Sequence, residues 1–257
     1  MNNSFGEILK KWRKTRRYSQ LQMAEEVGIS SRHISFLETG RSSPSDTIIL
    51  KFGRFLQMPR QEINRALLVS GYAPVYRDTI APDTDMKPIY FAIDKMLDDH
   101  MPFPAIVLDK EWDLVKANDS AKFLLEKIGF TKSVNFIECL YAEDPTTSKI
   151  VNWGETVSIL LERLKYEIDL IGGSDSLEKR EEKLRKHLQK NNIKQNLSYD
   201  QVAMNTQFDI DGEILSFFSV VSQFGAILDI NVSEFKVELL FPLNEKTKEF
   251  YEKEKWR

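Results

Sequence analysis

The stretch from Ser19 to Gly40 constrains the fold of this chain most strongly, because it encodes two short helices separated by a glycine. Ser19 followed three residues later by Gln22 is the capping-box pattern that begins a helix. Apolar residues then recur at helical spacing up to Gly28, and glycine readily adopts the left-handed conformation in which many helices end. The stretch therefore predicts a helix, a tight glycine turn and a second helix.

The second of these helices is predicted to present a polar face. Ser30 or Ser31 can cap its start, Ile34 and Leu37 lie on its inward side, and Gly40 closes it. Its outward residues are small, polar or basic, namely Ser31, Arg32 and Ser35. This pattern fits a recognition helix that lies in the major groove of DNA, although a helical hairpin inside a larger core would show the same apolar spacing.

Charge is distributed unevenly along the chain. Residues 1–72 contain 12 Lys and Arg against six Asp and Glu, which gives this segment a formal charge of +6. The whole chain carries −3, so residues 73–257 carry −9. A cationic N-terminal segment followed by an acidic remainder predicts that a polyanionic partner binds the N-terminal segment only.

Residues 5–70 resemble the DNA-binding domain of the Cro/cI-type repressors, also called the XRE family. The resemblance rests on Ser19-Gln20 at the start of the second helix, Gly28 in the turn, and the run from Leu37 to Arg41 that closes the third helix. It implies an all-α, five-helix, lambda-repressor-like domain over residues 1–72. The expected helices cover residues 4–16, 19–27, 30–38, 45–56 and 60–70.

The same resemblance implies double-stranded DNA as the partner and assigns its contacts. Gln20 is expected to contact the DNA backbone and an adjoining base, and Arg41 to lie near phosphate. The full set of expected DNA-binding residues is Gln20, Ser30, Ser31, Arg32, Ser35 and Arg41. Arg32 suits a bidentate contact to guanine, but a phosphate contact or an exposed surface position is also open.

Two features near this set are interpreted separately. Arg13 and Glu38 match a pair that ties the first helix to the third, so we expect them to be structural. Phe36 departs from the family pattern, in which a long polar residue is common at that position. Its ring can touch a thymine methyl group or simply pack, and packing is the preferred interpretation.

A proline-containing segment, residues 73–88, is predicted to link this domain to a second one that covers residues 89–257. A helix is expected over about 89–100. Strands are expected at 105–108 and 114–117, followed by a helix that Asn118 caps. A strand, a tight turn, a strand ending in asparagine and a helix resemble the opening of a Per-Arnt-Sim (PAS) sensor domain.

The remainder of the second domain is predicted to be helical first and β-rich later. An apolar stripe from Val157 to Ile171 and a charged segment over 177–190 predict two helices. Strands are expected over 200–210, 213–222 and 225–231, with turns at Asp211-Gly212 and at residues 224–225. A last helix is expected after Ser233. Together these elements predict an α+β, PAS-like domain.

The order of motifs along nearly the whole chain resembles bacterial regulators in which a Cro/cI-type domain precedes an MmyB-like ligand-binding domain. This resemblance implies a homodimer and a hydrophobic cavity, with fatty-acid-like molecules as the leading ligand class. Large aromatic side chains could line such a cavity. The expected ligand-binding residues are Phe123, Trp153, Phe217 and Phe218, although ordinary core packing is the alternative for each of them.

Other chemistries find little support. The three histidines show no metal-ligand spacing, and haem ligation by His100 or His187 is unsupported. Cys139 lacks the sequence context of flavin photoreceptors. Neither a metal nor a cofactor is therefore expected. Cys139 is expected to be a buried, small apolar residue. No phosphate-binding loop or nucleophile elbow is present, so the chain is not expected to be an enzyme.

No export signal and no membrane-spanning apolar run is seen, which predicts a cytoplasmic protein without a membrane partner. Three classes of function remain. The first is a one-component transcription regulator that senses a small molecule. The second is a regulator whose rear domain only dimerises or docks a protein. The third is an antitoxin-like or enzyme-linked protein that uses its helix-turn-helix for a protein partner.

Overall fold

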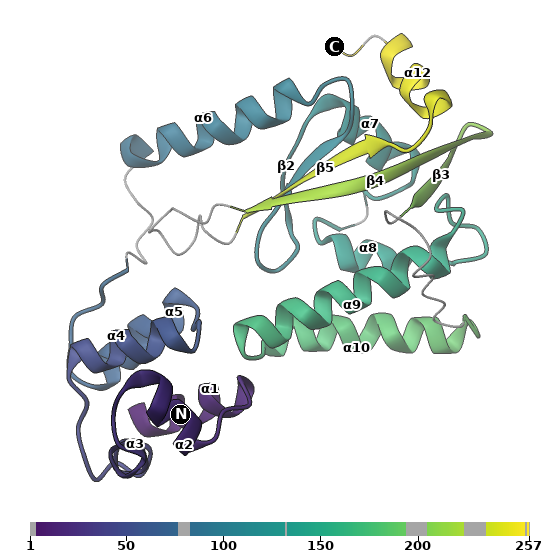
Figure 1. Cartoon of the computed structure of the whole chain (residues 1–257). Helices are drawn as coiled ribbons and strands as arrows, with labels where there is room; N and C mark the ends of the chain where they lie inside the picture. Colours follow the sequence, from purple (N-terminus) through teal and green to yellow (C-terminus); the bar gives the residue numbers. More distant parts are fainter. Residues whose placement is uncertain are drawn as a thin grey trace. The chain divides into compact units, whose positions relative to one another are not determined.

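The computed structural model describes residues 4–76, 83–131, 133–193, 205–223, 235–254 and 256. The chain divides into two compact units, one built mainly from its first eighty residues and one built from most of the remainder. We describe each unit by itself (Figure 1).

The first unit contains five helices among its described residues, each within one residue of its predicted bounds. They are α1 (Phe5–Thr15), α2 (Gln20–Val27), α3 (Ser31–Glu38), α4 (Asp46–Phe55) and α5 (Arg60–Val69). Serine begins four of them, because the side chains of Ser4, Ser19, Ser30 and Ser45 each accept a hydrogen bond from the backbone N–H three residues later. The predicted all-α, five-helix fold is confirmed.

The core of this unit holds α1 and α3 close together. Trp12, Met23 and Ile34 are fully buried in one apolar cluster. A Cβ atom added to Gly6 of α1 would lie 2.5 Å from the backbone oxygen of Leu37 in α3, so only glycine allows this approach. Gly28 ends α2 with a φ of 71°, as the turn prediction required.

The second unit combines helices with one sheet. Its helices are α6 (Asp83–Asp99), α7 (Asp119–Lys127), α8 (Phe136–Ala142), α9 (Trp153–Ile171), α10 (Asp175–Lys190) and α12 (Glu245–Lys253). Its strands are β1 (Ala105–Leu108), β2 (Leu114–Ala117), β3 (Thr206–Ile210), β4 (Glu213–Gln223) and β5 (Lys236–Pro242). The strand order is β2-β1-β5-β4-β3, and every neighbouring pair is antiparallel. The α+β prediction for this domain is confirmed.

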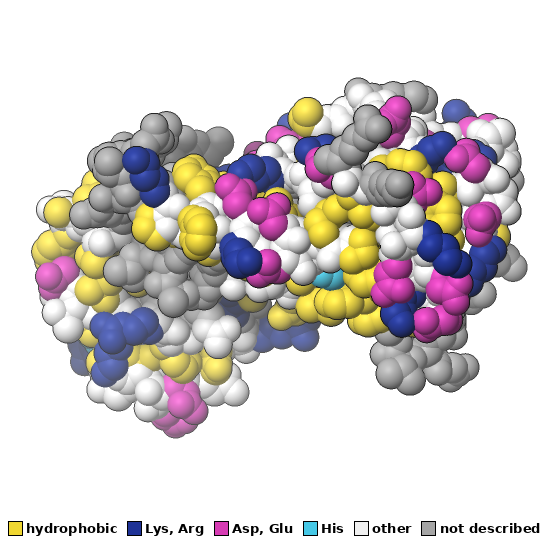
Figure 2. Space-filling model, turned by 90° about the horizontal axis from the view of Figure 1, so that it is seen from above, with side chains coloured by type: hydrophobic (Ala, Val, Ile, Leu, Met, Phe, Trp, Pro, Cys, Tyr) yellow, Lys and Arg dark blue, Asp and Glu magenta, His cyan; other side chains and the backbone are white. Residues whose placement is uncertain are grey.

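Helices cover both faces of the sheet (Figure 1). On one face, Ile93 and Leu97 of α6 pack against Ala105, Val107 and Val237. The residues that alternate with these along the strands face the opposite side, where α7, α8 and α9 lie. The face seen in Figure 2 mixes acidic, basic and hydrophobic side chains, and the exposed apolar residues of the chain include Phe91, which is 70% exposed.

The opening of the second unit follows its prediction closely. β1 and β2 have the predicted bounds, and Asn118 caps α7 by accepting a hydrogen bond of 2.9 Å from Ala121 N. The Asn118 side-chain amide also donates to the backbone oxygens of Leu97 and Phe103. One asparagine thus fixes the end of β2, the start of α7 and the end of α6.

Two predicted elements of this unit are wrong. The first helix begins at Asp83 rather than near residue 89, because Pro88 is accommodated inside it. The helix expected after Ser233 is replaced by β5, and the last helix begins only after Asn244, whose side chain accepts from Thr247 N. β5 lies between β1 and β4, so pairing with two distant strands decides its conformation.

Several smaller expectations have mixed outcomes. The turn at Asp211-Gly212 is confirmed by φ angles of 53° and 91°. Cys139 is buried, as expected. The strand expected over 225–231, the turn at 224–225 and the first residues of the strand expected over 200–210 lie outside the described residues. Where the structure describes the chain, no helix is long and apolar enough to cross a membrane.

Candidate functional site

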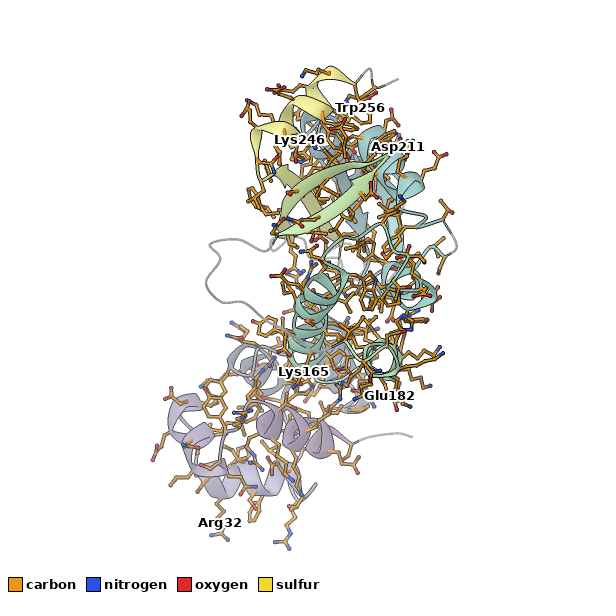
Figure 3. The ribbon with its side chains drawn as sticks, turned by 90° about the vertical axis from the view of Figure 1, so that its right-hand side faces the viewer. Arg32, Lys165, Glu182, Asp211, Lys246 and Trp256 are labelled. Carbon is orange, nitrogen blue, oxygen red and sulfur yellow. The ribbon has the colours of Figure 1, made fainter. Side chains whose placement is uncertain are left out.

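Helix α3, the predicted recognition helix, has an outward polar side. Ser30, rather than Ser31, is the N-cap, because its hydroxyl accepts a 3.1 Å hydrogen bond from His33 N. Ile34 and Leu37 are buried, so the side of the helix that carries Arg32 faces outward. Figure 3 shows the Arg32 side chain extending away from the helical unit. This is the exposure that a groove-reading side chain needs.

Phe36 lies beneath two cations rather than standing free. The guanidinium carbon of Arg32 is 5.2 Å from the centre of the Phe36 ring, and that of Arg41 is 6.0 Å from it. Arg41 N also donates a 2.8 Å hydrogen bond to the Phe36 backbone oxygen. The ring is half-buried. Phe36 therefore packs, as the preferred interpretation expected, and it makes cation–π contacts with both Arg32 and Arg41.

The predicted tie between α1 and α3 is confirmed and includes Gln20. Arg13 donates from Nε and Nη2 to the two carboxylate oxygens of Glu38, at 2.6 and 3.0 Å. Gln20 Nε2 donates to Glu38 Oε2 at 2.7 Å. The Glu38 carboxylate can only accept, so it fixes which end of the Gln20 amide faces it. This hydrogen bond places Gln20 at the junction of α2 and α3.

The buried position of Glu38 would by itself raise the pKa of its carboxyl. The hydrogen bonds from Arg13 and Gln20, together with the charge of Arg13, outweigh this effect and hold the pKa below its ordinary value. Glu38 is thus an ionised carboxylate that stabilises the domain. Its negative charge is compensated by Arg13, so it does not repel DNA as an unpaired charge would.

The six expected DNA-binding residues occupy one region of the first unit: the start of α2, α3 itself and the residue after Gly40. Ser31 and Ser35 are half-exposed, and the Ser35 backbone oxygen accepts a 2.7 Å hydrogen bond from Thr39 Oγ1. Ser30, Arg32 and Arg41 are exposed. Their contacts with DNA remain predictions, which the arrangement of these side chains makes geometrically feasible.

The second unit contains a pocket between the inner face of the sheet and helices α7, α8 and α9. The empty space within it measures about 890 Å³, including the part that opens to solvent. Most of its walls are apolar, with Ile106 and Leu240 from the sheet, Leu124 from α7, Leu140 from α8 and Leu160 from α9. Such a lining suits a hydrophobic ligand.

The four aromatic residues expected in a pocket lie in three different places. Phe217 and Phe218 line it from β4. Phe123 is not part of the lining and packs edge-on against Trp256, with ring centres 5.5 Å apart. Trp153 is also outside the lining and is buried against the His187 ring of α10, at 5.6 Å. α9 turns Thr156, Leu160 and Arg163 toward the pocket, and its Trp153 side faces α10 instead.

A cluster of charged side chains stands at the edge of this pocket. Arg163 and Glu238 belong to the lining, and Arg163 Nη1 donates to both Glu238 oxygens at 3.2 Å. Glu167 accepts from Arg163 Nε at 3.1 Å, Lys236 Nζ at 2.8 Å and Trp112 Nε1 at 2.9 Å. The Trp112 ring lies beneath both cations, 4.7 Å from Arg163 Cζ and 4.4 Å from Lys236 Nζ.

Burial governs the ionisation of this cluster. Burial lowers the pKa of Lys236, and its attraction to Glu167 offsets only part of that effect. For Glu167, burial would raise the pKa, but Lys236 and Arg163 outweigh it and keep the pKa below its ordinary value. Charges that are this buried persist only when they are paired. The two cations and two carboxylates form such a set.

This cluster was not predicted from the sequence. Two signals were available: Arg163 and Glu167 are spaced i, i+4 on a helix that is otherwise apolar on that side, and Lys236 and Glu238 alternate within an apolar strand. Neither signal shows that the two segments meet, because 73 residues separate Arg163 from Lys236. Only the pairing of β5 between β1 and β4 brings them together.

Each of the two units matches a known protein family. Residues 9–63 match the helix-turn-helix family, and residues 91–191 match the MmyB-like transcription regulator ligand binding domain. A search of curated proteins returned no significant match. The fold and these matches define the class: a DNA-binding transcriptional regulator with a ligand-binding domain.

More particularly, the chain carries an XRE-type helix-turn-helix domain at its N-terminus and an MmyB-like ligand-binding domain after it, as the resemblance predicted. Both are domains of transcription regulators. Within the described ranges, no group of three or more His, Cys, Asp or Glu side chains is arranged to hold a metal ion.

Proposed function

We propose that this protein is a one-component regulator that reads a specific DNA sequence with α3 and senses a hydrophobic, fatty-acid-like molecule with a PAS-like second domain. The DNA-reading role is supported by the exposed, cationic face of α3. The sensing role is supported chiefly by the apolar pocket between the sheet and α7–α9. The proposed limits are residues 1–72 for the first domain, a linker that ends where α6 begins, and a second domain that extends to residue 257.

Within this proposal, Arg32 and Arg41 have different tasks. Arg32 projects from the first turn of α3, where side chains reach base edges, whereas Arg41 follows the end of the helix, where backbone phosphates pass. Their shared contact with Phe36 keeps both guanidinium groups on the same side of the domain. Arg32 is therefore assigned to sequence discrimination and Arg41 to general affinity.

Replacing Arg32 by Ala is expected to reduce discrimination between operator and unrelated DNA about ten- to hundred-fold, because a bidentate contact to guanine is lost. Replacing Arg41 by Ala is expected to weaken all duplexes alike. Competition binding with an operator, recovered by selection from a random library, and a scrambled duplex measures both effects. Equal losses on every duplex from both changes would contradict the assignment of Arg32.

The ligand role can be tested by filling the pocket. Leu160 lines it from α9, whereas Glu162 on the same helix is exposed. Leu160→Trp is expected to lower the affinity for a long-chain probe at least about ten-fold, because the larger ring occupies the apolar space. Native mass spectrometry and titration with a long-chain fatty acid measure this, with Glu162→Trp as the matched control.

If the protein binds no long-chain probe and its operator affinity does not respond to one, the sensing half of the proposal fails. The second domain would then be one that only dimerises or docks a protein partner.

We also propose that the protein acts as a homodimer, because two recognition helices about 34–36 Å apart can engage successive major grooves. Sedimentation velocity is expected to show a dimer at the concentrations at which the operator is bound, and the operator is expected to be a pseudopalindrome. A monomer that binds a single asymmetric site with full affinity would contradict this.

A further inference from the structure

Among the described residues, one guanidinium nitrogen of Arg163, a residue of the pocket lining, has no hydrogen-bond partner. Arg163 has five N–H donors. Nε is used by Glu167, and Nη1 is used by Glu238. Nη2 is buried and has no hydrogen-bond partner among the described residues. A buried, unsatisfied N–H group on a charged side chain is costly, so its neighbourhood favours an incoming acceptor.

The charges around Arg163 already cancel. Arg163 and Lys236 contribute two positive charges, and Glu167 and Glu238 contribute two negative ones. The side chains of these four residues are between 4% and 19% exposed, so solvent screens them weakly. A ligand carboxylate at Nη2 would be a third negative charge beside Glu238, which lies on the same guanidinium. An uncharged oxygen acceptor would use the free N–H groups without that repulsion.

We propose that the pocket selects long-chain molecules with an uncharged oxygen headgroup, such as an amide, ester or lactone carbonyl, which accepts a hydrogen bond from Arg163 Nη2. This inference rests on the proposed ligand-binding function and narrows its ligand class. The apolar walls formed by Ile106, Leu124, Leu160 and Leu240 hold the chain, and Arg163 holds the headgroup. Glu238 is then the residue that disfavours the corresponding carboxylate.

The test compares ligands of one chain length: dodecanamide, methyl dodecanoate and dodecanoate at neutral pH, measured by isothermal titration calorimetry on the full-length protein. The amide and the ester are expected to bind at least about ten-fold more tightly than the carboxylate. Binding of the carboxylate as tightly as the amide, or more tightly, would overturn the inference while leaving the proposed function intact. Failure of all three probes to bind would instead contradict the proposed sensing function itself.

Two variants probe the assigned residues. Glu238→Gln leaves a net positive charge at the headgroup position and is expected to shift preference toward dodecanoate about ten-fold. Glu213→Gln, at an exposed end of β4 outside the pocket lining, is the matched control and is expected to leave the preference unchanged. An unchanged preference in Glu238→Gln would overturn the role of Glu238.

Arg163→Lys keeps the positive charge, which protects the fold, but it removes Nη2. This variant is expected to lose the advantage of the amide over dodecanoate while still binding the chain. Circular dichroism confirms that each variant is folded before binding is compared. If Arg163→Lys keeps the full advantage of the amide, Arg163 is not the headgroup partner.

Discussion

Raising the monovalent salt concentration from about 50 to 200 mM is expected to weaken operator binding about a thousand-fold, the result for six phosphate contacts. The first 72 residues carry a formal charge of +6. Exposed cations of this domain can release counterions from phosphates when they bind. These cations include Lys14, Arg17, Arg41 and Lys51.

Not every cation of the domain contributes to the loss of DNA affinity with increasing salt. Arg13 is paired with Glu38, and Arg16 donates from Nε to the Leu56 backbone oxygen at 2.8 Å. These two side chains are used inside the domain. The plot of log affinity against log salt is therefore expected to reflect the exposed cations, not the total count of Lys and Arg.

A filter-binding or anisotropy series over four salt concentrations measures the slope. Arg41→Gln is expected to reduce it by about one, as the loss of a single phosphate contact does. Lys165→Gln, which changes an exposed cation of α9 in the second unit, is the control and is expected to leave the slope unchanged. Affinity that is insensitive to salt would rule out DNA as the partner of this surface and favour a protein partner.

Replacing Glu38 by Gln is expected to lower the free energy of unfolding of the first domain by about 3 kcal/mol at neutral pH. The change leaves Arg13 in a site where its side chain is only 11% exposed, without a compensating charge. It also releases Gln20, so operator affinity is expected to fall together with stability. Hydrogen-exchange protection of α1–α5 in the full-length protein reports the loss of stability.

The same ion pair predicts the direction of the pH dependence. The pKa of Glu38 is lower in the folded state than its ordinary value, so its contribution is present above the unfolded-state pKa. That contribution is lost as the pH falls through the folded-state pKa. The difference in stability between the native protein and Glu38→Gln is therefore expected to shrink in acid. Glu25→Gln, at an exposed position of α2, is the control, and an equal effect there would contradict the assigned role of Glu38.

The first domain could be predicted almost completely because its signals are local. A serine hydroxyl caps the backbone N–H three residues later, and a glycine permits the left-handed turn; both interactions lie within a few residues of the chain. The apolar stripes then identify the buried faces. The roles of Arg13 and Glu38 came from family resemblance, and the structure added that Gln20 joins the same carboxylate.

In the second domain, the elements formed by neighbouring residues were predicted correctly, whereas the strand β5, which pairs with distant strands, was not. β1, β2 and the Asn118 cap form one contiguous unit, and all three were predicted correctly. β5 was wrongly predicted as a helix, because a strand between two distant partners takes its conformation from them. Trp153 and Phe123 were expected in the pocket lining, but they contact other parts of the domain. Helical spacing indicates that such residues are buried, but not which neighbouring element they face.

The helix-turn-helix, the cationic N-terminal segment, the opening of the second domain and the family to which each half is similar were predictable from the order of amino acids, because these features depend on short-range hydrogen bonding and on composition. The set of residues that surround the pocket was not predictable in this way, and neither was the cluster of Arg163, Glu167, Lys236 and Glu238 at its edge. Backbone hydrogen bonds can pair strands that lie far apart in the sequence. The pairing of β5 with β1 and β4 therefore brings its charged residues next to α9, although no local pattern indicates this contact.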